Sequence, residues 1–325
     1  MKKIKVLVST FPFAQTDPKA AELIINQGWE LEFNPYGRKI TSQELKIMLT
    51  GVDALIAGTE ELNKETLEFA NNLKLISRVG IGLDGIDWKE IKRRKIEVAY
   101  TPGAPTLSVA ELTLGFILDL SRDITNTAIN MRNRLWQRYT GRELTNKTVG
   151  IIGLGRIGKT LVRLLKPFNC KILVNDIKPD DKFIKENNLV LCEKKDIYKT
   201  ADFITLHLPL TELTYHLIDE GVLKIMQKDA FLINTSRGPV IDEKAVYNAL
   251  RNHQIKGVAI DVYEKEPYSG ILCELNNIIL TSHMGSCTEE SRRAMEIGAA
   301  QAVVDFFTGA PLKNRVPDEE RIAIE

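Results

Sequence analysis

The segment VGIIGLGRIGK, from Val149 to Lys159, places three glycines directly after a β-branched run and directly before a helical pattern. The run TVGII predicts a buried strand, and RIGKTLVRLLKPF predicts a helix that begins at the third glycine. In such a turn the first glycine permits a sharp bend, the second lets a pyrophosphate approach the backbone, and the third lets the helix pack closely on the strand. The segment therefore predicts the first strand–turn–helix of a nucleotide-binding sheet.

An acid at the end of the next strand strengthens this interpretation. The run CKILVND ends at Asp176, roughly 20 residues after the glycines, as the dinucleotide-binding pattern requires. A carboxylate there accepts hydrogen bonds from the adenosine ribose hydroxyls and repels a 2′-phosphate, which favours NAD over NADP. Since free N–H groups at the helix start face the phosphates, we expect Gly153, Gly155 and Gly158 to bind the cofactor. An ordinary strand–turn–helix without a ligand is the alternative.

Short apolar runs alternate with helical patterns along most of the chain, which predicts parallel sheets with helices on both faces. The first series of expected strands is IKVLV, WELEF, ALIAG, LKLISRVG and IEVAY, with candidate helices near 18–27, 42–49, 63–71 and 87–94. The second series is TVGIIG, CKILVND, DFITLHL, AFLINTS, IKGVAID and NIILTSH. A long helical stretch, about Pro105 to Trp136, separates the two series, and a last helix, about Glu289 to Thr308, could pack on either resulting domain.

Composition excludes several classes of function. Lys and Arg total 44 against 43 Asp and Glu, so no basic surplus is available for nucleic acid. No apolar run reaches the roughly 18 residues of a membrane span, and IKVLV near the start is too short for a signal peptide. The four cysteines show no Cys-x-x-Cys spacing, which argues against a metal site or a disulfide framework. We expect a cytoplasmic protein without nucleic-acid or membrane partners.

Polar residues follow several of the strands in the second series. His207 ends ITLHLP, His283 ends IILTSH, Arg237 follows AFLINTS, and Glu266 follows GVAIDVYEK. Ligands of open α/β sheets bind at the carboxyl ends of strands. An Arg, a Glu and a His after neighbouring strands could therefore meet at one edge of a cofactor, although each alone has an ordinary structural explanation.

Seven blocks occur in the order found in one enzyme family. They are RVGIGLDGID (78–87), TPGAPTLSVAELTLG (101–115), LTNKTVGIIGLGRIGK (144–159), HLPLTELTYHLI (207–218), LINTSRGPVIDEKAV (232–246), GVAIDVYEKEP (257–267) and TSHMG (281–285). On these blocks the chain resembles the D-isomer-specific 2-hydroxyacid dehydrogenases, in particular the phosphoglycerate dehydrogenase-like branch. The blocks span most of the chain, and an ordered set of this kind is far more specific than any single motif.

The resemblance implies a catalytic set of Arg237, Glu266 and His283. Arg237 would hold the substrate's carboxylate and oxo oxygen, because a guanidinium matches both in a fork of hydrogen bonds. His283 would exchange the hydroxyl proton as general base and acid, and Glu266 would orient the imidazole and favour its protonated form. Hydride would pass between the substrate C2 and the nicotinamide ring of NAD.

Further contacts are implied by the same resemblance. The backbone of Val79, Gly80, Ile81 and Gly82 would bind the substrate carboxylate, since glycines allow close approach. The remaining implied cofactor-binding residues are Arg156 and Ile157 at the pyrophosphate, His207, Leu208, Pro209 and Thr214 around the adenosine half, and Thr235, Ser236 and Asp261 near the nicotinamide.

The family's architecture explains why the glycine segment lies near the middle of the chain. A Rossmann nucleotide domain, residues 102–288, would be inserted into a flavodoxin-like substrate domain made of residues 1–101 and 289–325. Both would be doubly wound parallel sheets. The helix at SVAEL and the segment after it would form a homodimer contact.

Some positions depart from the family pattern and leave the substrate open. Gly85, Ser282 and Ser286 replace a usual Asn, Pro and Gly. Glu60 and Glu61 stand where an arginine would help bind a phosphate, although both could face solvent. Arginines at 78, 132, 134 and 138 and Trp136 could still serve a distal substrate group.

We therefore rank the pair 3-phosphoglycerate and 3-phosphohydroxypyruvate only narrowly above hydroxypyruvate, glyoxylate or another hydroxy acid. The chain ends soon after its last expected helix, so we expect no regulatory domain like those of some phosphoglycerate dehydrogenases. Formate dehydrogenase is disfavoured because that branch has Gln where Glu266 stands. An NAD-sensing corepressor or binding module is the alternative class, since fold alone does not settle function.

Overall fold

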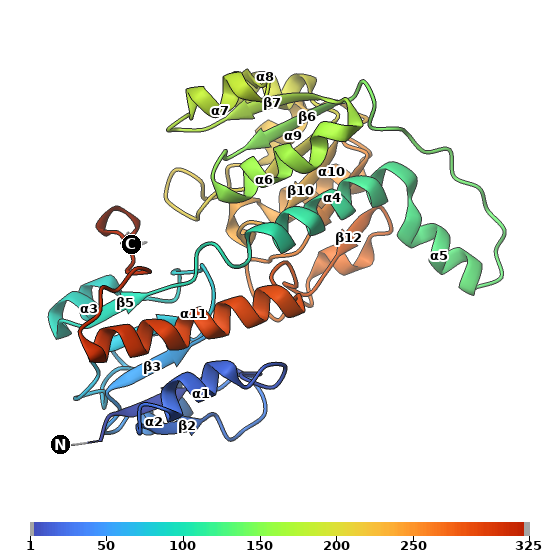
Figure 1. Ribbon diagram of the computed structural model, residues 1–325. Helices are drawn as coiled ribbons and strands as arrows, with labels where there is room; N and C mark the ends of the chain where they lie inside the picture. Colours follow the sequence, from blue (N-terminus) through green and yellow to red (C-terminus); the bar gives the residue numbers. More distant parts are fainter. Residues whose placement is uncertain (1–2, 322–325) are drawn as a thin grey trace. The chain divides into compact units, whose positions relative to one another are not determined.

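The computed structural model describes residues 3–321 and divides the chain into two compact units, shown in Figure 1. Unit 1 consists of residues 1–105 and 286–325, and unit 2 of residues 106–285. These limits fall a few residues from the domain limits expected at 101/102 and 288/289. Unit 1 is thus built from both parts of the chain that flank unit 2.

Unit 1 contains a five-stranded parallel sheet among its described residues. Its strands are β1 (Lys5–Val8), β2 (Glu30–Phe33), β3 (Ala54–Ala57), β4 (Leu75–Arg78) and β5 (Glu97–Ala99), in the order β2-β1-β3-β4-β5. This is the flavodoxin-like order. The helices are α1 (Lys19–Ile25), α2 (Ser42–Met48), α3 (Trp88–Arg94) and α11 (Glu289–Thr308).

The last helix, α11, packs on unit 1. It lies against α1 and the β3–β4 part of the sheet, and Ser77 Oγ of β4 donates a hydrogen bond to Ala299 O at 2.9 Å. Small residues such as Ala299 and Ala300 are fully buried and allow this close approach. The helix therefore completes the face of the sheet that the N-terminal part of the chain leaves uncovered.

Unit 2 contains a seven-stranded parallel sheet among its described residues. Its strands are β6 (Thr148–Ile152), β7 (Lys171–Asn175), β8 (Val190–Leu191), β9 (Phe203–Leu206), β10 (Phe231–Asn234), β11 (Gly257–Ile260) and β12 (Ile278–Leu280). The spatial order β12-β11-β10-β9-β6-β7-β8 is the doubly wound Rossmann order extended by one strand. The helices are α4 (Thr106–Arg122), α5 (Ile124–Arg132), α6 (Arg156–Leu165), α7 (Asp181–Glu186), α8 (Lys194–Thr200), α9 (Glu220–Ile225) and α10 (Glu243–Arg251).

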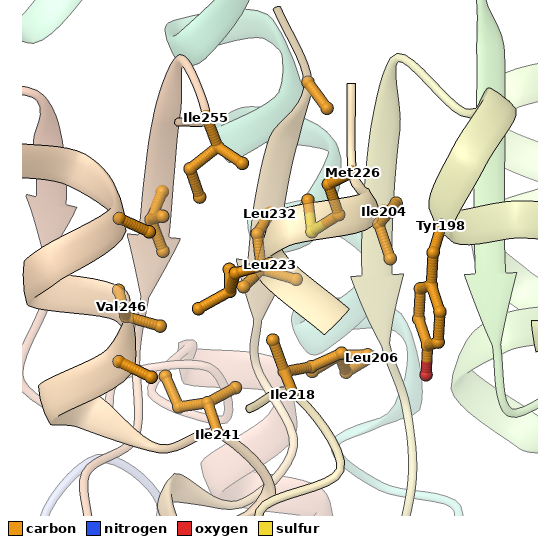
Figure 2. Packing of buried hydrophobic residues seen from close by; sticks show 14 of the residues in the cluster. Tyr198, Ile204, Leu206, Ile218, Leu223, Met226, Leu232, Ile241, Val246 and Ile255 are labelled. Carbon is orange, nitrogen blue, oxygen red and sulfur yellow. The ribbon is translucent and has the colours of Figure 1, made fainter. Parts of the chain in front are cut away.

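The strands are apolar throughout because helices cover both faces of the sheet. All residues of β9, β10 and β11 are buried, as expected for a parallel sheet inside an α/β unit. Figure 2 shows the core on one face, where Leu206 and Leu232 from the strands meet Leu223 of α9 and Val246 of α10. On the opposite face α4 and α6 pack on the same sheet.

The expected fold class is confirmed, with two local corrections. The helix expected near 63–71 is wrong, because this segment forms turns. Leu67 N donates to Asn63 O four residues back, but Ala70 N donates to Leu67 O, only three residues back. The long helix expected from Pro105 to Trp136 is two helices, because Asp123 adopts a left-handed conformation with φ 53°. Asp119 accepts hydrogen bonds from the backbone and hydroxyl of Thr125 and stabilises the break.

The sheet order of unit 2 fixes where a ligand can bind. The topological switch point lies between β6 and β9, where consecutive connections leave in opposite directions. The glycine turn follows β6 and His207 follows β9, while Arg237, Glu266 and His283 follow the adjacent strands β10, β11 and β12. None of the helices between residues 3 and 321 combines the length and apolar composition that a bilayer span requires.

Candidate active site

The three glycines after β6 differ in their surroundings. A Cβ at Gly153, which has φ 98°, would lie 2.2 Å from His207 O, and one at Gly158 would lie 2.2 Å from Gly153 O. Both positions therefore exclude a side chain. A Cβ at Gly155 would find no described atom within 4 Å, so this glycine borders open space at the switch point. In this motif a pyrophosphate would pass beside the second glycine, and the open space at Gly155 fits a pyrophosphate.

The start of α6 leaves backbone donors beside this space. Gly155 is the N-cap residue and supplies no capping side chain, so the N–H groups of Arg156 and Ile157 are oriented as in other phosphate-binding helix termini. Asp176 lies across the turn: its Oδ2 accepts from Leu154 N at 2.6 Å and its Oδ1 from Lys178 N at 2.8 Å. These bonds hold the carboxylate at the place where a ribose is expected. The donors, the open space and the acid together fit NAD.

His207 closes the other side of the glycine turn. Its carbonyl oxygen lies against Gly153, and its Nε2 is 3.1 Å from Thr205 Oγ1. The residue is partly accessible, but its Nδ1 is buried and has no hydrogen-bond partner among residues 3–321. Burial lowers the pKa of His207 from 6.5 to about 3, so the ring is neutral. The uncharged ring therefore borders one side of the glycine turn.

The segment after His207 forms a tight turn. Leu208 Cδ2 would contact a Cβ at Gly153 at 3.2 Å, which places this side chain against the glycine turn. Thr214 Oγ1 donates to Pro209 O at 2.7 Å and accepts from Thr211 N at 2.8 Å. The Thr214 hydroxyl thus stabilises the turn itself.

The Glu266 and His283 side chains form a hydrogen-bonded pair. His283 Nδ1 lies 2.8 Å from Glu266 Oε2, and Glu266 Oε1 accepts from Tyr263 N at 3.1 Å. Both side chains remain accessible, with 43% of His283 and 37% of Glu266 exposed. A carboxylate on Nδ1 fixes the ring orientation and the tautomer, which leaves Nε2 to exchange a proton.

Asp261, at the end of β11, holds the loop that carries His283. Its Oδ1 accepts from Thr281 Oγ1 at 2.6 Å and from Met284 N at 2.8 Å, and its Oδ2 accepts from Gly285 N at 2.8 Å. The residue is only 1% exposed, so these bonds form in a water-poor environment. They span His283, whose φ of 52° is left-handed. Asp261 therefore determines where the imidazole points.

Arg237 follows β10 on a loop that is fixed from both sides. Asn234 Nδ2 donates to Arg237 O at 2.9 Å, and Asn234 Oδ1 accepts from the backbone and hydroxyl of Ser236. A Cβ at Gly238 would lie 1.9 Å from Tyr263 C, so this loop packs directly on the segment that leads to Glu266. Arg237 itself is half-buried, and its Nη1 donates to Ser236 O at 2.8 Å.

The predicted cofactor residues of this loop are buried beside α4. Thr235 Oγ1 lies 3.0 Å from Thr113 Oγ1 of α4, and both residues are at least nine-tenths buried. Sequence reasoning missed Thr113, Asn234 and Tyr263 as supports of the site. Only Asn234 carried a local signal, because it is a polar residue that ends an otherwise apolar strand.

The loop predicted to bind a carboxylate lies in unit 1 after β4. The amide of Val79 donates to Ala57 O at 2.8 Å, and that of Gly80 donates to Thr101 Oγ1 at 2.8 Å. Gly80 has φ 140°, a conformation that side chains disfavour. Of the four predicted residues, Val79 and Gly80 thus use their amides within the fold, and Ile81 and Gly82 follow them in the loop.

Across the described part of the chain, no group of three or more His, Cys, Asp or Glu residues is placed to hold a metal ion.

The family model and the similar proteins found by comparison point to the same family. Residues 114–285 match the family model described as "D-isomer specific 2-hydroxyacid dehydrogenase, NAD binding domain". A glyoxylate reductase of Thermofilum pendens is 38% identical over 277 residues, which cover 82% of each chain. A D-3-phosphoglycerate dehydrogenase of Methanocaldococcus jannaschii is 36% identical over 283 residues, which cover 85% of this chain but only 54% of that protein. The chain thus spans about half the length of the second relative.

Solved structures agree with the fold. The crystal structure of the TT0316 protein from Thermus thermophilus superposes with a TM-score of 0.88 and 28% sequence identity, covering 97% of this chain and 100% of that one.

The neutral ring of His207, whose Nδ1 is buried, predicts a pH-dependent stability. Below pH 6.5 the unfolded chain binds a proton at this position, whereas the folded chain does not until about pH 3. The free energy of unfolding therefore loses up to about 1.4 kcal/mol per pH unit between these values, or about 2 kcal/mol by pH 5. Urea unfolding of wild type and His207→Gln at pH 8 and pH 5 measures this. Wild type should lose about 2 kcal/mol relative to the variant.

His253 provides the control, because it is exposed. His253→Gln should keep a constant stability difference from wild type at both pH values. A constant difference for His207→Gln as well would contradict a lowered pKa of His207 in the folded chain.

Proposed function

The chain belongs to the D-isomer specific 2-hydroxyacid dehydrogenase family, and we propose that it interconverts a D-2-hydroxy acid and its 2-oxo acid by hydride transfer with NAD. The observation that carries this proposal is the 2.8 Å pair of Glu266 and His283, which follow β11 and β12. These two strands continue the sheet from β10, which Arg237 follows. A binding module would not need a proton-exchanging group held in this way.

His283 acts as the general base in oxidation and the general acid in reduction. Glu266 accepts from Nδ1, so Nε2 is the atom that takes the hydroxyl proton of the hydroxy acid or returns it to the oxo acid. Asp261 keeps the imidazole in place through its three hydrogen bonds to the surrounding loop. Glu266 and Asp261 thus position His283 rather than react.

Arg237 binds the negatively charged part of the substrate. Its loop is held by Asn234 and by the packing of Gly238 on Tyr263, so the guanidinium has a defined base from which to reach a carboxylate and the oxo oxygen. The family resemblance assigns carboxylate binding in unit 1 to the backbone of the loop from Val79 to Gly82, in which the amides of Val79 and Gly80 donate within the fold.

The NAD-binding residues hold the cofactor without reacting with it. When bound, NAD accepts or supplies the hydride. The turn from Gly153 to Gly158 takes the pyrophosphate, and Asp176 takes the ribose hydroxyls. His207, Leu208, Pro209 and Thr214 border the adenosine half, and Thr235 and Ser236 border the nicotinamide end; in this role they shape the binding surface.

Two groups of substrates fit this chemistry. The sequence ranks 3-phosphoglycerate first, and the Methanocaldococcus jannaschii relative named as a D-3-phosphoglycerate dehydrogenase supports it. The Thermofilum pendens relative named as a glyoxylate reductase, which this chain covers far more completely, supports hydroxypyruvate or glyoxylate. A cytoplasmic location, where NAD is available, belongs to the same proposal.

We also propose a homodimer, because α5 and residues 131–140 expose apolar side chains that a second copy of the chain would cover. No residue of α5 is buried, and residues 131–140 are all exposed. In Figure 1 α5 and the segment after it extend away from the sheet of unit 2. The exposed apolar side chains there are Ile124, Ile129, Met131, Leu135, Trp136 and Tyr139. An apolar surface of this kind marks an interaction site.

Replacement of the proposed acid–base group should separate chemistry from binding. We expect His283→Ala to lower kcat for NADH-dependent reduction of 2-oxo acids by at least 100-fold, while NADH still binds, since the glycine turn is untouched. Steady-state assays give kcat, and quenching of protein fluorescence gives the Kd for NADH. If wild-type protein binds NADH but reduces none of a broad panel of 2-oxo acids, the NAD-sensing binding module replaces the enzyme.

Removal of the ribose acceptor should change cofactor preference. Asp176→Ala removes the carboxylate that repels a 2′-phosphate, so the ratio of kcat/KM for NADH to that for NADPH should fall about tenfold or more. Asp180→Ala is a matched control, because Asp180 pairs with Lys159 on α6 and not with the turn. An unchanged ratio in Asp176→Ala would contradict the ribose role.

The mass of the oligomer can be measured directly. Light scattering on the purified protein should give twice the chain mass. Trp136→Asp, which puts a charge on a side chain that is 77% exposed in the single chain, should shift the mass toward the monomer. A wild-type protein of single-chain mass at micromolar concentration would contradict the dimer.

A further inference from the structure

His216 joins three loops at the carboxyl edge of the sheet in unit 2. It belongs to the loop between β9 and α9, and its backbone N donates to Pro239 O at 2.8 Å. Its side-chain Nε2 lies 3.0 Å from Glu264 Oε1. Pro239 is two residues after Arg237, and Glu264 is two residues before Glu266. His216 thus contacts the loops that carry two of the three proposed catalytic residues.

The backbone and the ring of His216 are both fixed. The residue has φ 46°, a left-handed conformation that is uncommon outside glycine, and the hydrogen bond to Pro239 anchors it there. The ring of Tyr215 stacks on the imidazole, with 4.1 Å between the ring centroids and 12° between the planes. Because the imidazole is already held, little side-chain freedom is lost when it contacts Glu264.

Glu264 is fixed at its backbone as well as at its side chain. Its N–H donates at 2.9 Å to Oε1 of Glu243, the first residue of α10. The preceding residue, Tyr263, donates its N–H to Glu266 Oε1 at 3.1 Å. The turn from Tyr263 to Glu266 is therefore held from one side by α10 and from the other side by His216, and the Glu266 carboxylate is part of this turn.

Acidic side chains surround the turn. Burial is the main cause that raises the pKa of the Glu243 carboxyl, and the charges of Glu264 and Asp242 add to it. Among residues 3–321, His216 is the only basic side chain within ion-pair distance of the Glu264 carboxylate. The contact that fixes the Glu264 side chain from outside α10 therefore depends on one histidine.

The pair of His216 and Glu264 is too exposed to serve mainly the stability of the fold. The exposed fraction of the side chain is 29% for His216 and 38% for Glu264. Exposed ion pairs contribute little to the free energy of unfolding, because water competes for both partners. The orientation of a group that exchanges a proton, in contrast, is sensitive to small displacements of its supports. The contact is thus better suited to positioning than to stabilising.

We propose that His216 is a positioning residue for the acid–base pair. Through Glu264 it holds the turn that presents Glu266, and so keeps the Glu266 carboxylate on Nδ1 of His283. Through Pro239 its backbone fixes the loop that carries Arg237. This inference rests on the proposed dehydrogenase function, and it gives His216 no contact with substrate or cofactor.

Two replacements separate the side-chain contact from the backbone that carries it. The side-chain nitrogen of Gln lies as many bonds from Cα as Nε2 of His, so His216→Gln keeps a donor within reach of Glu264. Asn tolerates a left-handed backbone, but its side-chain nitrogen lies one bond closer to Cα, so His216→Asn loses the contact. His253→Asn is the matched control, because His253 is also left-handed, with φ 52°, and is exposed.

Steady-state kinetics with NADH and the 2-oxo acid that wild type reduces fastest give the first measurement. His216→Asn should lower kcat about tenfold, because the acid–base pair loses its alignment. The Kd for NADH should change less than about twofold, since the loss falls on alignment and not on binding. Both His216→Gln and His253→Asn should keep kcat within about threefold of wild type.

Nitrogen NMR of the histidine rings in the cofactor-free protein gives a second measurement, which needs no turnover. The chain has four histidines, so comparison with His283→Ala assigns the His283 ring. At alkaline pH the Glu266 carboxylate should hold the proton of the neutral His283 ring on Nδ1. The ratio of this tautomer to the one protonated on Nε2 should fall at least about threefold in His216→Asn but not in His216→Gln.

Three outcomes would overturn the positioning role. They are an unchanged kcat and tautomer ratio in His216→Asn, a lower melting temperature of that variant with kcat preserved, and an equal loss of kcat in His216→Gln. Failure of the proposed function looks different, because wild type would then reduce none of the 2-oxo acids, while the tautomer ratio of His283 would still respond to His216→Asn.

Discussion

The proposed proton transfer depends on the hydrogen bonds that the Asp261 carboxylate accepts, because they position His283. Asp261 accepts hydrogen bonds from Thr281, Met284 and Gly285, and so ties the end of β11 to the loop after β12. The imidazole of His283 sits between these anchors in a left-handed conformation that an unsupported loop would rarely keep. The Glu266 carboxylate then orients the ring through its hydrogen bond with His283 Nδ1. The resemblance assigned Asp261 to the nicotinamide end of the cofactor, and its geometry adds a positioning role.

Much of the fold follows from the sequence because parallel sheets impose strong patterns. Apolar runs alternating with helical periods predicted both sheets, and the last helix matches α11 from Glu289 to Thr308. The errors are local departures from a helical pattern. Asp123 breaks a continuous helical period through its left-handed backbone, and the segment from Asn63 to Ala70 forms turns despite good helix formers. Propensity cannot foresee such local choices, since tertiary contacts decide them.

Some features of the candidate site were predictable from the sequence and others were not. Residues at strand ends were identified because the topology brings carboxyl ends together, and the pair of Glu266 and His283 forms as expected. The burial of Glu60 was not foreseen. The carbonyl oxygen of Glu60 lies against Gly85 and accepts a hydrogen bond from Arg78 Nη1. Both residues are far from Glu60 in the sequence and give no periodic signal. A glycine in place of a larger residue was visible in the sequence, but the carbonyl oxygen that it accommodates was not.

The fate of the transferred hydride tests the central claim most directly. Purified protein would be incubated with hydroxypyruvate and NADH that carries deuterium at one or the other of the two C4 hydrogens of the nicotinamide, in two separate reactions. The product would be analysed by chiral chromatography and mass spectrometry. The account predicts glycerate of the D configuration in both reactions, with one deuterium on C2 in one of them. Product of the L configuration, product without deuterium under both C4 labels, or no product from any 2-oxo acid would contradict it.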